Sequence, residues 1–276
     1  MLGALLVLGA ALCTPLSSAK TIVRYPQREM PNDYPLQVLQ LALREAGVDF
    51  VIKPSTVAMS QGRALEQLAK GLDVDVVWSM TSQERESALR PIRIPIDKGL
   101  LGWRLILTSQ SGAEALSKVN SLDDLRKLQA GQGHDWPDTE ILRHNGLPVQ
   151  IGASYLGLFN MLRAGRFDYF PRSIIEIWSE QKAYGLQDLV IDKNLVLYYP
   201  TALYFFVNKN DPGLAGAIEN GLNKAIANGK FEQLFQQTYG EAIQRALIKG
   251  RTRIELVNPL LPKATPLARK ELWITF

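Results

Sequence analysis

The sequence predicts an α/β protein made of two lobes that are connected by two crossings of the chain. Its 276 residues suffice for two ordinary domains with a sizeable core. Helical and β-rich segments alternate in two separate units, residues 21–78 and 121–183, and long β-rich runs lie between and after them. Open α/β sheets bind ligands beyond the carboxyl ends of their strands, so two facing lobes would enclose a ligand cleft.

The first segment of the chain has the pattern of a secretory signal peptide. Residues 2–12 form an apolar run too short for a typical membrane-spanning helix. Ser17 and Ala19 place small residues at the −3 and −1 positions of a cleavage site, and we expect residues 1–19 to be removed. Lipidation of Cys13 is disfavoured, because Leu12 stands where a small residue is expected. The positive segment is missing, which is compatible with a start further upstream.

The first unit reads as three strands separated by two helices. Leu36, Leu39 and Leu43 repeat at helical spacing, and Gly47 supplies a stop, as Gly71 does for the second helix. The expected segments are a strand over 21–25, a helix over 36–46, a strand over 50–52, a helix over 64–69 and a strand over 74–78. The continuous apolar character of the last strand is typical of a mostly parallel sheet.

The second unit begins at Ser121, where the stretch Ser-Leu-Asp-Asp fits a capping box. Its expected segments are strands near 130–131, over 149–151 and over 167–170, and helices over 137–145, 155–164 and 174–183. Outside the units we expect a long strand over 99–108, β-rich runs at 195–199 and 202–207, helices over 212–229 and 231–239, and an extended tail at 258–262 that docks on the body. Residues 20–104 with 205–276 would form the first lobe, and residues 105–204 the second.

Several short motifs resemble those of the bacterial extracellular solute-binding proteins of family 3. Residues 81–86 look like the Thr-x-x-Arg segment of that family, and residues 162–168 are similar to its Leu-x-x-Gly-Arg-x-Asp signature. Residues 91–108 and 199–208 look like its two crossings, while residues 133–138 resemble a divergent branch. The resemblance implies a type II periplasmic-binding-protein clamp that binds a small, amino-acid-like molecule between its lobes in the periplasm. It also implies an inner-membrane permease or a sensor as partner.

Arg85 is the main candidate for a ligand anchor. It follows a strand end, where side chains point into an interlobe cleft, and a guanidinium can hold a carboxylate by two parallel hydrogen bonds. By resemblance it matches the arginine that binds the ligand carboxylate. The hydroxyl donors expected beside it are Ser79, Thr81 and Ser82. The alternative is a surface arginine paired with Glu84 or Glu86.

A departure from the family pattern affects the expected ligand. Where the family's acidic residue binds the ligand ammonium, this chain has Ser173, with Arg172 beside it. An arginine repels a cation, so the sequence favours an anionic ligand or one without a free ammonium. Glu176, one helical turn further on, could replace the acid in part. In the alternative interpretation, Arg172 merely faces solvent.

The stretch over residues 131–139 and three aromatic residues complete the candidate site. Two glycines before a helix start can expose backbone N–H groups to an anion, which places His134, Asp135 and Trp136 in the site. Alternatively, Asp135 or Asp138 caps the helix, and Trp136 is either a stacking platform or a lid over the core. Tyr25, Tyr34 and Trp78, near strand ends or in the following loops, would form an aromatic wall, unless they are ordinary core.

Composition and absent motifs exclude several function classes. The formal net charge of +4 is dispersed, unlike the basic stripe of a nucleic-acid binder. The chain has no Gly-x-Ser-x-Gly elbow, no Walker loop and no His-Glu-x-x-His motif. We therefore expect a monomeric binding protein without cofactor, metal or nucleic acid. The alternatives are an enzyme on the same scaffold, similar to cyclohexadienyl dehydratases and using Asp135 or Glu176 as its acid, or a sensor or accessory protein without an importer.

Overall fold

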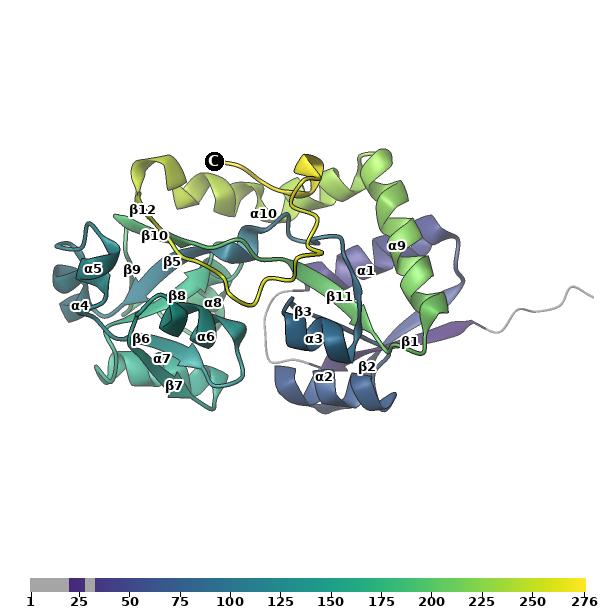
Figure 1. Ribbon diagram of the computed structural model, residues 1–276, viewed down its shortest axis with the longest axis horizontal. Coiled ribbons are helices and arrows are strands. Elements are labelled where there is room, and N and C mark those ends of the chain that lie inside the picture. The colour runs from purple at the N-terminus through teal and green to yellow at the C-terminus, as the bar shows by residue number, and fades with distance from the viewer. Residues whose placement is uncertain (1–19, 28–32) are drawn as a thin grey trace, which may run out of the picture.

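The computed structural model describes residues 20–27 and 33–276, so the expected signal peptide and Cys13 lie outside the described residues. Figure 1 shows two α/β lobes side by side, with the C-terminal part of the chain running along both. This is the predicted two-lobed α/β arrangement. Within the described ranges, no helix is long and apolar enough to cross a membrane.

The first lobe contains two small sheets. In the first, β1 (Thr21–Gln27) pairs in parallel with β2 (Phe50–Ala58). In the second, β11 (Leu203–Val207) lies between β3 (Val76–Met80) and β4 (Arg90–Ile92) and is antiparallel to both. The helices of this lobe are α1 (Tyr34–Ala46), α2 (Gln61–Lys70) and α3 (Gln83–Ala88). The sheets are connected by a hydrogen bond from the Asp75 N–H to the Arg24 carbonyl (2.9 Å).

Helix α9 (Pro212–Ala227) returns to the first lobe and packs against α1. The buried face of α1 includes Leu39 and Leu43, which repeat at helical spacing as the sequence predicts, whereas Val38 is buried in place of the predicted Leu36. At the contact, a Cβ at Gly221 would lie 1.7 Å from the Ala42 carbonyl oxygen. A glycine at this position therefore allows the two helices to approach closely.

The second lobe is built on one mixed sheet in the order β12-β10-β5-β8-β6-β7, with β9 also pairing with β5. Its strands are β5 (Trp103–Thr108), β6 (Ala130–Gly133), β7 (Val149–Gly152), β8 (Tyr169–Ser173), β9 (Val190–Ile191), β10 (Leu195–Tyr198) and β12 (Thr252–Glu255). Its helices are α4 (Gln110–Leu116), α5 (Leu122–Leu125), α6 (Pro137–His144), α7 (Tyr155–Arg163) and α8 (Ile177–Ala183). Strands β6, β7 and β8 are parallel, so their carboxyl ends lie at one edge of the sheet.

Two of the crossings that connect the lobes lie between β4 and β5 and between β10 and β11. They touch each other, since the Tyr199 N–H donates to the Gly102 carbonyl (3.2 Å). Residues 100–102 form a 3-10 turn and not the start of the strand expected over 99–108. The fully buried Asp97 accepts hydrogen bonds from the N–H groups of Gly99 (3.1 Å) and Leu101 (2.7 Å). It thereby holds the turn at the start of the second lobe.

The C-terminal segment departs from the expected lobe boundaries. After α10 (Lys230–Ala246), β12 pairs in parallel with β10, so residues 252–255 lie in the sheet of the second lobe and not in the first. Trp103 and Arg104 likewise belong to the second lobe, because they are in β5. The reason is that the exposed N–H and C=O groups of an edge strand can pair with any extended segment that lies beside it. The local sequence of residues 252–255 does not show which strand they will pair with.

The tail after β12 docks on the body, as expected. The Asn145 side chain exchanges two hydrogen bonds with the backbone of Val257 (2.8 and 2.9 Å) in the second lobe. The tail then reaches the first lobe, where the Gln83 N–H donates to the Leu260 carbonyl (3.1 Å). Near the end of the chain, the Ile274 N–H donates to the carbonyl of Lys98 in the first crossing (2.9 Å). The tail therefore contacts both lobes and the crossing between them.

Candidate functional site

A cavity of about 730 Å³ lies between the lobes and is lined by both of them. From the first lobe, β1, β3 and the start of α2 contribute, and from the second lobe the segments that follow β6, β7 and β8. The predicted site residues that line it are Tyr25, Trp78, His134, Asp135, Trp136 and Arg172. The predicted site residues outside its lining are Ser79, Thr81, Ser82, Arg85 and Ser173. The structure thus brings together the aromatic residues and the 131–139 stretch, but not the whole of the Arg85 cluster.

Arg85 bridges the lobes instead of facing the cavity. Its Nη1 donates to Ser79 Oγ (2.7 Å) and to the Met80 carbonyl (2.8 Å). Its Nη2 donates to Gln61 Oε1 (3.1 Å) and, across the cleft, to the Asp135 carbonyl (3.3 Å). These acceptors are all neutral, and burial lowers the pKa of Arg85 to about 10.

The other members of the Arg85 cluster have structural roles. Ser82 caps α3 by accepting the Arg85 N–H (3.2 Å), while the Thr81 hydroxyl donates to Glu86 (2.7 Å). Glu86 pairs with Arg93 and not with Arg85, so the alternative of a surface ion pair between Arg85 and Glu86 does not hold. The cluster supports the strand end beside the cavity.

Asp135 connects the second lobe to the first lobe. Its Oδ2 accepts the N–H of Gly62, in the first turn of α2 (3.1 Å). The expected cap on α6 is wrong, since Trp136 occupies the N-cap position and no side chain caps the helix. Asp135 instead binds the N-terminus of α2, which has N–H groups without partners in the helix. This helix belongs to the other lobe, so the local sequence around Asp135 does not reveal the contact. The N–H groups of His134 and Trp136 donate to the carbonyls of Gly152 and Gly133 (3.1 and 3.2 Å).

Trp136 combines both roles considered for it. Its ring stacks nearly parallel to that of Phe170, at 6.2 Å between centroids and 10° between planes. The Arg172 guanidinium lies 5.1 Å from the Trp136 ring centroid, and Trp136 also lines the cavity. It therefore covers the core of the second lobe and presents an aromatic surface to the cavity.

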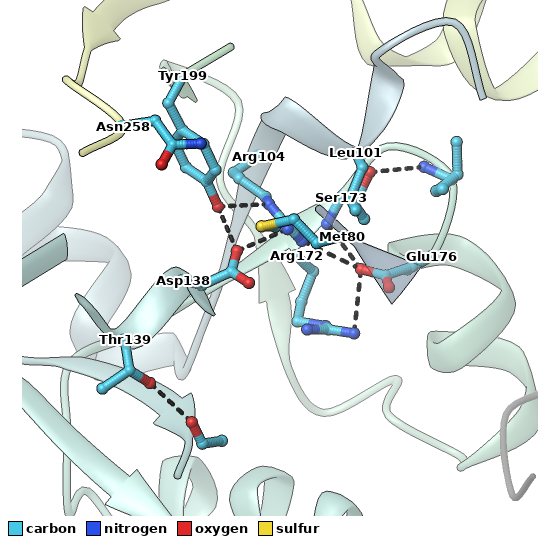
Figure 2. Close-up of polar contacts among 12 residues, drawn as sticks. Met80, Leu101, Arg104, Asp138, Thr139, Arg172, Ser173, Glu176, Tyr199 and Asn258 are labelled. Carbon is cyan, nitrogen blue, oxygen red and sulfur yellow. Dashed lines mark hydrogen bonds and ion pairs between the residues drawn. The ribbon is translucent and has the colours of Figure 1, made fainter. Parts of the chain in front are cut away.

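A buried network of charged side chains forms the wall of the cavity in the second lobe (Figure 2). Arg104, 2% exposed, contacts carboxylates from two other segments, Asp138 of α6 (Nη2 to Oδ1, 2.6 Å) and Glu176 (Nη1 to Oε2, 3.3 Å). Its Nε donates to the Tyr199 hydroxyl (2.8 Å), which in turn donates to Asp138. Arg104 thus connects β5, α6 and the start of α8.

Arg172 lies next to Arg104, on β8, and is also 2% exposed. The solvent-facing alternative for Arg172 is therefore wrong. Its guanidinium is bound by Glu180 (Nε to Oε2, 2.9 Å) and by Glu176 (Nη2 to Oε2, 3.1 Å). Burial raises the pKa of the Glu176 carboxyl, while the positive charge of Arg172 opposes that rise. Two carboxylates thus compensate the cation that the sequence singled out as an anion anchor.

Ser173, predicted at the ammonium position, faces inward. Its hydroxyl donates to the Leu100 carbonyl (2.9 Å), and its N–H donates to Glu176 Oε2 (3.2 Å). Arg104 was missed as a site residue by sequence reasoning. The signal that could have found it is a charged residue inside the otherwise apolar strand Trp-Arg-Leu-Ile-Leu-Thr, because a fully buried arginine requires partners.

The residues that the structure describes contain no group of three or more His, Cys, Asp or Glu side chains placed to hold a metal ion. His134 lines the cavity and is exposed to solvent. The cavity lining presents hydrogen-bonding, charged and aromatic side chains.

Two α/β lobes around an interlobe cavity constitute the fold of the periplasmic binding proteins, and solved structures of that class match the chain. An ancestral arginine-binding protein bound to arginine matches with a TM-score of 0.61 and 16% identity over 80% of this chain and 99% of that chain. A histidine kinase sensor domain similar to periplasmic binding proteins matches with a TM-score of 0.61 and 17% identity over 80% and 96%. An ancestral amino-acid-binding protein, a precursor of cyclohexadienyl dehydratase, matches with a TM-score of 0.59 and 15% identity over 79% and 95%.

No family model matches the chain, and no curated protein matches its sequence. The predicted resemblance in fold to the amino-acid-binding proteins is confirmed. Identities of 15–17% establish the fold alone.

Proposed function

We propose that this chain is a periplasmic solute-binding protein that closes over a small, polar, amino-acid-like molecule between its lobes. The observation that carries the proposal is the cavity of about 730 Å³ with charged and aromatic side chains from both lobes. Its volume is in the range of small-molecule sites, which bury most of the ligand surface among apolar side chains and a few placed polar groups. Enclosure by two lobes provides a closed state for a partner to recognise.

We assign ligand contact to the cavity-lining residues Tyr25, Trp78, His134, Asp135, Trp136 and Arg172. Arg104, Asp138 and Glu176 join them as residues found from the structure. Arg85 would act from behind the cavity, by holding the carbonyl of Asp135 and the side chain of Gln61. A ligand that displaces either acceptor would gain direct access to its guanidinium.

The test is thermal unfolding of the purified protein against a broad panel of amino acids, amines, organic acids and sugars. Unfolding and refolding first removes any ligand carried over from expression. A ligand at a hundred times its dissociation constant adds about 2.7 kcal/mol, which raises the midpoint by several degrees at this size. We expect such a shift with at least one solute, and its loss in Trp136→Ala. A flat response to the whole panel would contradict solute binding.

We further propose a periplasmic location, a monomeric state and a membrane partner, either a permease or a sensor. The fold supports both partners, since importer receptors and a kinase sensor domain share it. Genes for a permease and an ATPase beside the coding gene would favour import, and a signalling gene would favour sensing. A monomer elutes at about 30 kDa in size-exclusion chromatography, given the 30.8 kDa chain.

An enzyme on this scaffold is the second candidate, and one observation favours it. Glu176 lines the cavity, and burial raises the pKa of its carboxyl, as a general acid requires. Such an acid could protonate the leaving hydroxyl of prephenate or arogenate, which departs as water while the ring carboxyl departs as carbon dioxide. Incubation with both substrates and detection of phenylpyruvate or phenylalanine tests this. Turnover that disappears in Glu176→Gln would establish the enzyme; we expect no turnover.

A further inference from the structure

The charges around the cavity have an excess of negative sign, although the whole chain carries a formal +4. Two guanidinium groups line the cavity, those of Arg104 and Arg172. The carboxyl groups that line it are those of Asp33, Asp135, Asp138 and Glu176. Behind the lining, the Glu180 carboxylate next to Arg172 and the Arg85 guanidinium next to Asp135 offset each other, so four carboxyl groups face two guanidinium groups. A low-dielectric, partly enclosed space strengthens the field of this excess, which attracts cations and repels anions.

Two carboxyl oxygens in this wall are available to a ligand. Asp138 engages Arg104 and Tyr199 through Oδ1, and Glu176 engages Arg104, Arg172 and Ser173 through Oε2. Within the described part of the chain, Asp138 Oδ2 and Glu176 Oε1 have no hydrogen-bond partner. Neither belongs to the fully buried unpaired atoms, so both are accessible.

The two carboxylates flank one guanidinium. Arg104 contacts Asp138 through Nη2 and Glu176 through Nη1, and Figure 2 shows the two acids on either side of it. Both acids therefore lie in the same stretch of the cavity wall, one on each side of Arg104. An ammonium or guanidinium supplies several N–H donors and the opposite charge, and hydrogen bonds between charged groups are the strong ones.

The remaining cavity wall suits the same chemistry. Tyr25 and Trp78 of the first lobe stack at 6.0 Å between centroids, and Trp136 and Tyr155 of the second lobe face the cavity as well. Aromatic faces attract cations through the quadrupole of the ring. By contrast, the expected anchor for a ligand carboxylate, Arg85, lies outside the cavity lining and donates to four neutral acceptors.

From these observations we infer that the ligand is a small organic cation without a carboxylate, an amine or a guanidine, whose charged group binds Asp138 and Glu176 beside Arg104. This inference rests on the proposed solute-binding function and names the ligand class for the same cavity. A carboxylate on the ligand would face the excess negative charge without a free guanidinium in the lining. The site therefore favours an amine over the amino acid that has the same side chain.

The test is isothermal titration calorimetry on the refolded protein with matched pairs that differ by one carboxylate. The pairs are agmatine and arginine, cadaverine and lysine, putrescine and ornithine, and tyramine and tyrosine. We expect at least one amine to bind, and to bind at least tenfold more tightly than its amino acid. An amino acid that binds as tightly as its amine, in every pair that binds, would overturn the inference and leave solute binding intact.

The remaining outcomes are also decisive. Binding of some other solute from the broad panel, with none of the pairs, would overturn the cation inference alone. No binding by any solute would overturn the proposed function together with it. As a second readout, we expect Asp138→Asn and Glu176→Gln each to weaken amine binding at least tenfold, and the exposed control Glu114→Gln to leave it unchanged. The pairs are measured on the unaltered protein, so they decide the question even if a variant does not fold.

Discussion

The carboxylate of Asp135 in the second lobe accepts a hydrogen bond from the N–H of Gly62 in the first lobe, at 3.1 Å. The carbonyl of the same residue accepts from Arg85 of the first lobe, at 3.3 Å. One residue thus joins the lobes beside the cavity through its side chain and its backbone. Because the N-terminus of α2 carries partial positive charge, a carboxylate there is also favoured by the helix dipole. These contacts hold the two lobes together beside the cavity.

Asp135→Ala should shift the ligand-free protein toward an open state. A hydrogen bond to a charged group contributes about 1.5–3 kcal/mol, so its loss changes the closed-to-open ratio at least tenfold. Spin labels on the two lobes, read by pulsed EPR, would show the longer distances gain population. Asp135→Asn keeps an acceptor and should stay closer to wild type. An unchanged distance distribution in Asp135→Ala would show that the contact does not hold the lobes.

Arg104→Met should destabilise the protein strongly. The substitution leaves Asp138 and Glu176 buried beside an apolar side chain, and breaking a buried ion pair costs about 3–5 kcal/mol. At this chain length the melting temperature should fall on the order of 10 °C. Calorimetry measures it. The matched control is Arg163→Met, which removes a half-exposed pair with Asp188 and should cost at most about 1 kcal/mol. Equal losses in both variants would contradict the role of the buried network.

Stability should depend on pH through Asp97. Burial raises the pKa of its carboxyl to about 6 in the folded protein, against about 3.9 in an unfolded chain. The folded state therefore binds the proton more tightly. The buried charge destabilises the protein fully above pH 6, and this penalty is relieved as the pH falls from 6 to about 4. Relative to Asp97→Asn, wild type should gain about 2 kcal/mol of unfolding free energy between pH 7 and pH 4. Urea unfolding at several pH values checks this, and a constant difference would contradict it.

Asn145→Ala should release the C-terminal tail. The side chain satisfies both backbone groups of Val257 and also donates to the Ile141 carbonyl, at 2.8 Å. Each lost hydrogen bond costs about 0.5–1.5 kcal/mol, so the tail after β12 should open locally. Limited proteolysis should then cut within residues 256–276 faster than in wild type. The exposed Asn223→Ala should behave as wild type, and equal cleavage rates in all three proteins would show that Asn145 does not hold the tail.

Local sequence patterns determined most of the secondary structure and the two-lobed fold. Helical spacing with a glycine stop identified α1 and α2, because both signals act within a few residues of each other. Tyr25 and Trp78 were placed in the cavity on their position near strand ends, and they line it, whereas Tyr34, predicted with them, is buried in the core. The position of a residue at a strand end predicts its place in the site, because a parallel sheet brings the carboxyl ends of its strands to one edge for any set of side chains.

Tertiary structure alone decided the chemistry of the site. The sequence places Arg172 beside a serine, but Glu176 and Glu180 compensate its charge. Arg104 is paired with Asp138 and Glu176, which come from other segments of the chain. Arg85 lies after a strand end, as the sequence predicts, but its guanidinium donates hydrogen bonds to neutral acceptors in both lobes. Charge compensation depends on which side chains lie within a few ångströms of each other, and that proximity arises between segments far apart in sequence. The sequence therefore determined where the cavity lies, and the packing of distant segments determined the sign of the charge that lines it.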